Sequence, residues 1–521
     1  MNKNIKLVLI MMSVSVVSNF LGFGREMILA YKFGASAITD SYLLAQVLPI
    51  LILGGFLNTL TTGVTPIYSN LIKNKKELAS NYIQLMLLAM ITLAFLFIIL
   101  YSFFDEIIFT VLGSTLNAYS LNLTLKMTEI MMFSLIFISI ISILGAYLQY
   151  NNHFLIVSFS NLIVVNISLI VFIVISSDEN PLSMAYGYFF GYLFSCLILI
   201  ITAFKSGFKL TKRKTESQIY VRESFVIAIP IFLGSLAGQI NALIDRYLAS
   251  TLDVGTISAL NYANRIYLMV IVLFAVTIST IIFPKISKMV VNNDKEKIKS
   301  IFLKSLIVPS YLLIPITYIL FNYSEEIIRF VFERGEFSSS DTLKTAQALS
   351  FYSLGILFAS YREIIVKLFI AHKETKTITW NAIIMVIFNI VLNLILINKY
   401  EHIGLALATS LSFFISIVLL YRPLNKVLSG INLINIVKKI VLIIICTTIS
   451  GAFFSLIYEL VISGDNNLYY MIGVISITIV LSVIIYALLL VLSFKFFDKE
   501  EYNWFFYQVN LILKKFYKMK G

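Results

Sequence analysis

The chain has 521 residues, of which 59% are hydrophobic and only 13% are charged, and its mean hydropathy is +0.92. Soluble domains carry about 25% charged residues, so this composition excludes a soluble globular protein and indicates a protein that spans a bilayer. The formal net charge of +13 is expected to reflect membrane topology and attraction to anionic lipid, not a nucleic-acid surface. The two cysteines and three histidines are scattered and predict neither a disulfide framework nor a metal centre of these ligands.

Apolar windows of about 20 residues predict fourteen transmembrane helices. In chain order these begin near Ile5, Tyr42, Tyr82, Glu129, Phe154, Met184, Phe225, Ser258, Phe302, Leu349, Thr379, Ile403, Ile440 and Tyr469. The first one is expected to remain in the mature chain, because its apolar stretch is long and contains a charged pair, unlike a cleaved signal.

Basic residues gather in alternate loops of this fourteen-helix arrangement. The basic loops hold Lys73, Lys75, Lys76, Lys205, Lys209, Lys212, Arg213, Lys214, Arg222, Lys285, Lys288, Lys295, Lys297, Lys299, Arg422, Lys426, Lys438 and Lys439, and the tail adds further lysines up to Lys520. The other loops carry acids such as Asp105, Asp178 and Asp465. Because Lys and Arg concentrate on the cytoplasmic side, both termini are predicted to be cytoplasmic.

The predicted fold is an all-α polytopic membrane protein built from two six-helix bundles and two extra helices. Residues 1–204 form the first bundle, the basic linker 205–224 follows on the cytoplasmic side, and 225–421 form the second bundle. Residues 422–495 hold the two extra helices, and 496–521 are predicted to form an amphipathic basic helix in the membrane interface. Two even-numbered bundles starting on one side would be parallel repeats, an arrangement in which transporters place a binding cavity between bundles.

Two charged residues interrupt the first apolar segment of each half. They are Arg25 and Glu26 in the first half, and Asp245 and Arg246 in the second. A charge at the bilayer centre costs roughly 2.5 to 3.5 kcal/mol, so such residues are expected to face a partner or a wet cavity. Neighbouring residues of a helix point about 100° apart, so Glu26 is not expected to be the direct partner of Arg25. A purely structural ion pair, or a helix end at the interface, is the alternative.

Several segments, in order along the chain, resemble the MurJ/MviN lipid II flippases of the multidrug/oligosaccharidyl-lipid/polysaccharide exporter superfamily. They are Ser18–Glu26, Phe33–Asp40, Ile244–Ser250, Ile257–Arg265, Phe283–Lys288, Glu333–Phe337, Thr345–Leu349 and Ala371–Thr377. The resemblance implies a V-shaped pair of bundles that moves an undecaprenyl-pyrophosphate-linked sugar precursor, lipid II foremost, to the outer leaflet by alternating access. It implies a transporter, not an enzyme, in the bacterial plasma membrane, with membrane lipids and cell-wall synthesis proteins as further partners.

The resemblance also supplies candidate substrate-binding residues. Arg25 and Arg265 match the family's cavity arginines, and Arg362 and Lys367 lie near the tenth predicted helix. Guanidinium groups can replace the hydration of a pyrophosphate through bidentate hydrogen bonds. The acids Glu26 and Asp40 would balance or orient the arginines, because unpaired cations in a low dielectric are costly.

Two departures from the family pattern leave the substrate open. The chain has Asn19 where the family usually has a basic residue, and Leu53 near a position that is often Arg. A less cationic cavity would also suit an O-antigen or capsule unit, and a drug/cation antiporter of the same superfamily is a further alternative. A membrane enzyme is disfavoured, because the longest outer loops, residues 104–128 and 322–348, show acids but no nucleophile and base.

No nucleotide-binding motif occurs, so no organic cofactor is expected, and an ion gradient or the membrane potential is the expected drive. Asp245, Asn389, Asn393 and Thr409 match the oxygen ligands of a sodium site in some family members, with Asn393 standing where an Asp would be. Hydrogen bonding between helices is the alternative for these polar residues.

Overall fold

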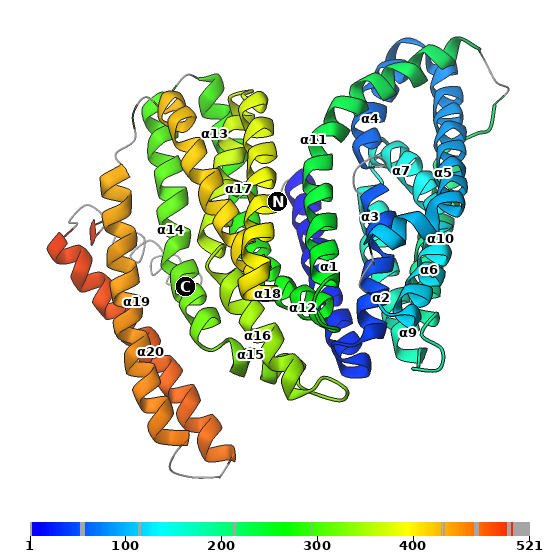
Figure 1. Cartoon of the computed structure of the whole chain (residues 1–521). Helices are drawn as coiled ribbons and strands as arrows, with labels where there is room; N and C mark the ends of the chain where they lie inside the picture. The colour runs from blue at the N-terminus through cyan, green and yellow to red at the C-terminus, as the bar shows by residue number, and fades with distance from the viewer. Residues whose placement is uncertain are drawn as a thin grey trace, which may run out of the picture. The chain divides into compact units, whose positions relative to one another are not determined.

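The computed structural model describes residues 3–52, 58–112, 116–211, 215–292, 294–428, 430, 433–462, 468–497 and 502–503. Within these ranges the regular secondary structure is helical throughout (Figure 1). The first helices are α1 (Lys3–Phe33), α2 (Ala37–Ala45), α3 (Val47–Ile52), α4 (Asn58–Asn74), α5 (Lys76–Leu112), α6 (Ala118–Met132), α7 (Ser134–Tyr150), α8 (Phe154–Phe159), α9 (Val165–Ile175) and α10 (Ser183–Lys205). The others are α11 (Gln218–Ser250), α12 (Thr256–Ile271), α13 (Thr277–Val291), α14 (Lys295–Asn322), α15 (Ser324–Phe332), α16 (Ser339–Ser353), α17 (Ile356–Ala371), α18 (Thr375–Val427), α19 (Leu433–Ile462) and α20 (Leu468–Phe497).

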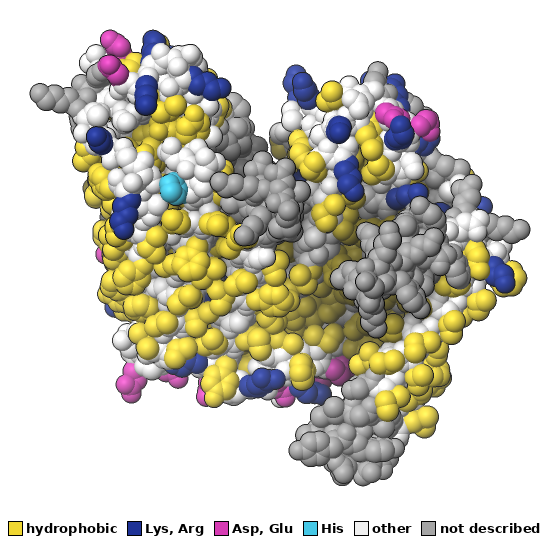
Figure 2. Space-filling model, turned by 180° about the vertical axis from the view of Figure 1, so that it is seen from behind, with side chains coloured by type: hydrophobic (Ala, Val, Ile, Leu, Met, Phe, Trp, Pro, Cys, Tyr) yellow, Lys and Arg dark blue, Asp and Glu magenta, His cyan; other side chains and the backbone are white. Residues whose placement is uncertain are grey.

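Membrane-spanning character is confirmed by the length and surface of these helices. Within the described ranges, nine helical segments are long and apolar enough to cross a bilayer. Large apolar side chains such as Phe103, Ile175 and Leu488 point outward with more than half of their surface exposed, and Figure 2 shows hydrophobic side chains covering much of the face in view. Such exposure suits lipid and would be unusual for a soluble protein. The count of fourteen spans stays a prediction, and the predicted amphipathic helix of 496–521 lies almost entirely outside the described residues.

Packing divides the chain into two compact units. Unit 1 comprises residues 1–269, 324–352 and 378–416, and unit 2 comprises residues 270–323, 353–377 and 417–521. The boundaries of the bundles stay a prediction, because this division follows packing and not the repeat. All the residues of the principal site described below belong to unit 1.

Two helical stretches of unit 1 depart from regular geometry where they carry polar residues. A π-helical segment, η2 (Ser160–Val164), joins α8 to α9. Helix α18 is two helical segments joined at Glu401, whose backbone dihedrals (φ 47°, ψ −128°) are not helical. Hydrogen bonds join the two segments, because the Asn381 amide nitrogen donates to the Ser416 carbonyl at 2.9 Å. This pairing aligns the polar faces of the two segments, which carry Asn389 and Thr409.

Unit 2 has its own apolar core. Ile314 of α14, Ile443 of α19, and Leu490 and Phe494 of α20 are buried against one another. The Tyr486 hydroxyl of α20 donates to the Tyr311 carbonyl of α14 at 2.8 Å. The α19–α20 hairpin is therefore packed on α14 through both apolar and polar contacts.

Candidate substrate-binding site

Arg25 and Glu26, near the end of α1, form an ion pair, with 2.6 Å between Arg25 Nη2 and Glu26 Oε1. The expectation that helix geometry would keep Glu26 from pairing directly with Arg25 is therefore wrong. The roughly 100° between neighbouring side chains applies at the Cβ atoms, whereas the long arginine side chain folds back along the helix surface to its neighbour. The pair is largely withdrawn from solvent, with 20% of the Arg25 side chain and 5% of the Glu26 side chain exposed.

Helix α12 supplies a second hydrogen-bond partner of Glu26. Asn261 Nδ2 donates to Glu26 Oε2 at 3.0 Å, so both carboxylate oxygens are bound. The Glu26 charge also acts on the guanidinium groups of Arg246 in α11 and Arg265 in α12. Glu26 therefore pairs directly with Arg25 and interacts electrostatically with Arg246 and Arg265. This arginine cluster, defined as Arg25, Arg246 and Arg265 around Glu26, carries a net positive charge inside a membrane-spanning unit.

Arg265 reaches α1 beside the Arg25–Glu26 pair. Its Nη2 donates to the Asn19 backbone carbonyl at 3.4 Å, and the two guanidinium groups repel each other. The Asn19 side chain, which replaces the family's usual basic residue, instead donates to the Ser15 carbonyl at 2.9 Å. The structure brings together Arg25, Glu26 and Arg265 as predicted from the sequence, whereas the place of Arg246 in the cluster was not predicted.

Asp40, in the first turn of α2, binds the start of α12. Its carboxylate accepts from the Gly255 backbone N–H at 2.6 Å, from the Ser258 N–H at 2.8 Å, and from the Ser258 hydroxyl. A carboxylate at unsatisfied N–H groups of a helix start stabilises both the hydrogen bonding and the helix dipole. Its observed contacts therefore cap α12, and the predicted role of balancing an arginine stays a prediction.

Three turns interlock at this end of unit 1, which we call the three-turn cluster: Gly34–Ser36, Leu252–Gly255 and Arg334–Phe337. The Glu336 N–H donates to the Tyr31 carbonyl at 2.9 Å, and the Tyr262 hydroxyl donates to the Gly34 carbonyl at 3.2 Å. Gly255 has a φ of +86°, and a Cβ there would lie 2.3 Å from the Ala35 carbonyl oxygen. Backbone therefore meets backbone without side chains between, and the chain is closed tightly here.

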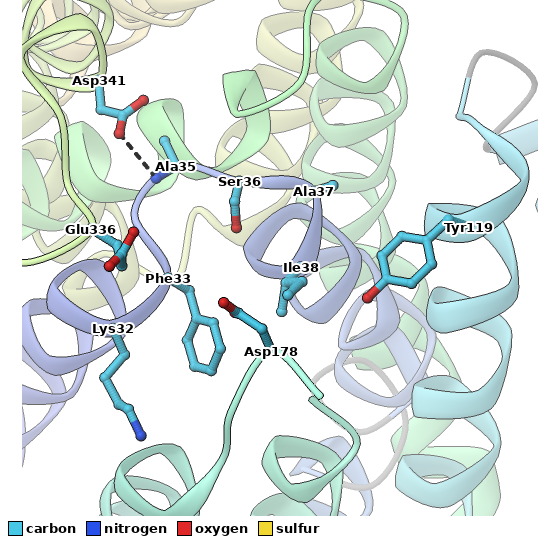
Figure 3. Close-up of a pocket in the computed structure, with 10 residues that line it drawn as sticks. All are labelled: Lys32, Phe33, Ala35, Ser36, Ala37, Ile38, Tyr119, Asp178, Glu336 and Asp341. Carbon is cyan, nitrogen blue, oxygen red and sulfur yellow. Dashed lines mark hydrogen bonds between the residues drawn. The ribbon is translucent and has the colours of Figure 1, made fainter. Parts of the chain in front are cut away.

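Beside the three-turn cluster lies a pocket of about 400 Å³. Figure 3 shows the side chains of Asp178 and Tyr119 directed toward the start of α2, and the hydrogen bond between Asp341 and the Ala35 N–H. Lys32, also on the wall, already donates to the carbonyls of Val174 and Ser176, both at 2.5 Å. Three carboxylates therefore dominate the pocket (Asp178, Glu336 and Asp341). Its charge is opposite to that of the arginine cluster, so it is unsuited to a phosphate group.

Arg362 and Lys367 belong to α17 in unit 2. Lys367 Nζ lies 3.4 Å from Glu363 Oε1, which also accepts from the Ser279 hydroxyl at 3.5 Å. Arg362 interacts electrostatically with the same acid. Their role in substrate binding stays a prediction.

The four residues predicted to bind sodium come together in unit 1. Asn393 Nδ2 lies 2.6 Å from Asp245 Oδ1 and 2.9 Å from Asn389 Oδ1, and Asn389 Nδ2 lies 3.5 Å from Thr409 Oγ1. The Asn389 amide also fits in the opposite orientation, with its nitrogen 2.8 Å from Asn241 Oδ1. Asn393 Oδ1 is buried and has no hydrogen-bond partner. An orphaned buried oxygen beside a carboxylate fits a hard cation, because such ions bind oxygen ligands.

Comparisons with known proteins agree with this picture. The family model described as "Lipid II flippase MurJ" matches residues 29–475. The chain belongs to the MurJ lipid II flippase family. It is 31% identical over 428 residues to the "Probable lipid II flippase MurJ" of Buchnera aphidicola subsp. Baizongia pistaciae, covering 79% of this chain and 81% of that protein. It is 26% identical to the protein of the same name from Rickettsia prowazekii, covering 80% and 83%.

The fold comparison shows a MurJ-type architecture over 94% of the chain. The solved structure "Lipid II flippase MurJ, inward closed conformation" has a TM-score of 0.79 and 26% identity, covering 94% of this chain and 99% of that one. An inward-facing multidrug resistance MATE family transporter has a TM-score of 0.69 at 11% identity, covering 79% and 94%, and at that identity it shows the fold alone. As a member of the MurJ family, the protein is a multi-pass membrane transporter with an all-α fold.

Proposed function

We propose that this protein is a lipid II flippase, which moves the undecaprenyl-pyrophosphate-linked precursor of peptidoglycan from the cytoplasmic to the outer leaflet. The observation that carries the proposal is the arginine cluster, in which Glu26 pairs with Arg25 and interacts electrostatically with Arg246 and Arg265, in a MurJ-family chain. A drug/cation antiporter would instead need a negatively charged cavity, because its substrates are cations. The pyrophosphate is a compact anion, and guanidinium groups bind phosphate oxygens bidentately.

The ion pair of Arg25 with Glu26 sets the first step of binding. Glu26 accepts from Nη2 of the Arg25 guanidinium at 2.6 Å and so engages one of its edge N–H groups. A pyrophosphate brings more negative charge than one carboxylate, so it competes for Arg25 and Arg265. Asn261, which donates to Glu26, then holds the displaced carboxylate and limits its repulsion of the phosphate.

The three-turn cluster would block the exit of the headgroup at one end of unit 1 while the headgroup binds. The distribution of Lys and Arg in the loops supports a cytoplasmic amino terminus, which would put this cluster at the outer side, because α1 runs from Lys3 to Phe33. Its opening would then release the headgroup outward in an alternating-access cycle. The capping of α12 by Asp40 stabilises the closed form.

Coupling to a sodium gradient is the drive that the polar set around Asp245 supports. Asp245, Asn389, Asn393 and Thr409 would hold the ion by their oxygens, and the bound ion would neutralise Asp245 inside the membrane. Asp245 is next in sequence to Arg246 of the arginine cluster. An ion on Asp245 therefore acts on the same turn of α11 that contacts α2.

The direct test is replacement of a bacterial cell's own lipid II flippase. Expression of this chain should sustain growth when the native flippase is depleted and should keep lipid II accessible at the outer leaflet. The Arg25→Ala variant should fail at equal abundance, whereas Arg222→Ala, on an exposed part of α11, should succeed. Failure of the unmodified chain, inserted at normal abundance, to restore lipid II translocation would contradict the function.

A further inference from the structure

The π-helical segment η2 carries a backbone carbonyl, that of Leu162, whose hydrogen-bond partner Asn166 contacts Arg25. A π segment widens the helix by one residue per turn, and such segments are frequent at functional sites. The Leu162 carbonyl inside η2 accepts from two side chains, the Asn166 amide nitrogen at 2.6 Å and the Ser18 hydroxyl at 3.3 Å. The widened turn thus ties α1 to α9 through a backbone acceptor.

These contacts fix the orientation of the Asn166 amide. Its nitrogen donates to Leu162 O at 2.6 Å and to Ser18 Oγ at 3.4 Å, so its oxygen faces the opposite way. That oxygen lies 3.4 Å from Arg25 Nη1. The reverse orientation would place an amide donor against a guanidinium donor and a carbonyl against a carbonyl, so the observed one is favoured.

The second guanidinium approaches the same amide because α1 has no side chain at Gly22. A Cβ at Gly22 would lie 2.0 Å from Arg265 Nη2 and 3.8 Å from Asn166 Oδ1. Arg265 and Asn166 therefore converge on the bare backbone of α1 at this residue. The amide oxygen of Asn166 is a neutral acceptor for Arg25, whereas Glu26 is the charged one.

We propose that Asn166, oriented by η2 and Ser18, is a positioning residue that holds Arg25 open toward the phosphate groups of the substrate and away from full pairing with Glu26. The proposal rests on the proposed function. The acceptor must be neutral, because a second carboxylate at this place would occupy the guanidinium groups that the pyrophosphate needs. An apolar residue would leave Arg25 Nη1 without its partner and let the guanidinium turn onto Glu26.

The test measures binding of purified full-length protein to lipid II in nanodiscs, with Asn161 as a matched control. Asn161 lies in η2 itself, and its oxygen accepts from the Ser195 hydroxyl at 3.0 Å, not from an arginine. Asn166→Asp should raise the Kd for lipid II by roughly tenfold, since it adds like charge beside the phosphate. Asn166→Ala should raise it by a smaller factor, and Asn161→Asp and Asn161→Ala should leave it near the unmodified value.

A rescue separates positioning from a structural role. If the added carboxylate acts on the arginines, the double variant Asn166→Asp with Glu26→Gln, which restores the number of acids, should recover part of the lost affinity. Unchanged affinity in folded Asn166→Asp and Asn166→Ala, or an equal loss in the Asn161 variants, would overturn the proposal. Absence of saturable lipid II binding by the unmodified protein would instead contradict the function on which it rests.

Discussion

Arg246 of α11 donates from Nη1 to the backbone carbonyl of Leu43 in α2, at 2.6 Å. Leu43 lies in the last turn of α2, where carbonyl groups lack helical partners and carry partial negative charge. The guanidinium therefore caps α2 from another helix. The Glu26 charge acts on the same group, so the arginine cluster and the end of α2 share one residue.

Replacing Arg246 should weaken unit 1 more than replacing an exposed arginine of the same helix. Arg246→Ala leaves the Leu43 carbonyl without this donor, at a cost on the order of 1.5 to 3 kcal/mol for a charged hydrogen bond. Thermal unfolding in detergent should show a lower midpoint for Arg246→Ala than for Arg222→Ala. Equal midpoints would mean that the hydrogen bond contributes nothing to stability.

The two family-matched arginines should be needed for transport but not for folding. Arg25→Ala or Arg265→Ala should lower lipid II translocation by about tenfold or more, because each removes a charged, bidentate phosphate contact. Arg25→Lys and Arg265→Lys should recover it only partly, since an ammonium lacks the planar fork. The measurement is lipid II exposure at the outer leaflet at matched protein abundance. Full transport by both alanine variants would show that these charges are structural.

The close backbone packing of the three-turn cluster can be tested with two glycines that share a backbone conformation. Gly255 (φ +86°) would place a Cβ 2.3 Å from a carbonyl oxygen, whereas Gly207 (φ +90°) has nothing within 4 Å of its Cβ position. Gly207→Ala should cost only the left-handed strain, about 1 to 2 kcal/mol, and Gly255→Ala should cost more. Thermal midpoints that fall equally in both would show that the turns separate without penalty.

Topology can be tested with two residues on either side of α10. Asp178 precedes this helix, Lys209 follows it, and both are exposed. In a background lacking Cys196 and Cys446, an impermeant thiol reagent applied to intact cells should label Asp178→Cys and spare Lys209→Cys. Labelling of both, or of Lys209→Cys alone, would contradict a cytoplasmic amino terminus.

The long apolar stretches of the sequence predicted a membrane protein made of helices. This was possible because the transfer of a helix into lipid depends mainly on its apolar composition. The family resemblance predicted six substrate-binding residues, and the structure brings three of them together at α1: Arg25, Glu26 and Arg265. Local geometry was less predictable. The direct pairing of Glu26 with Arg25 depends on side-chain length, and the position of Asn166 depends on a π turn with no sequence signature of its own. The capping of α12 by Asp40 joins residues more than 200 positions apart, which no local pattern encodes.

The final prediction concerns sodium binding by the polar residues around Asp245. Asn393 Nδ2 now donates to Asp245 Oδ1 at 2.6 Å, and Asn393 Oδ1 is buried without a partner. A bound cation would satisfy that oxygen, and Asn393→Asp should tighten its binding, because a carboxylate is a stronger ligand for a hard cation than an amide. Asp245→Asn should weaken it.

The measurement for this last prediction is the thermal midpoint of purified protein in sodium against potassium at equal ionic strength. Asn393→Asp should show a larger sodium-specific rise than the unmodified chain, by the mass-action effect of a ligand that binds only the folded state. Asp341→Asn, which alters an acid at the three-turn cluster, is the control and should keep the unmodified response. If neither the unmodified chain nor Asn393→Asp responds specifically to sodium, the four residues only join helices. Transport would then be driven by the membrane potential, which is worth about 2.3 kcal/mol per charge for each 100 mV, acting on the arginine cluster.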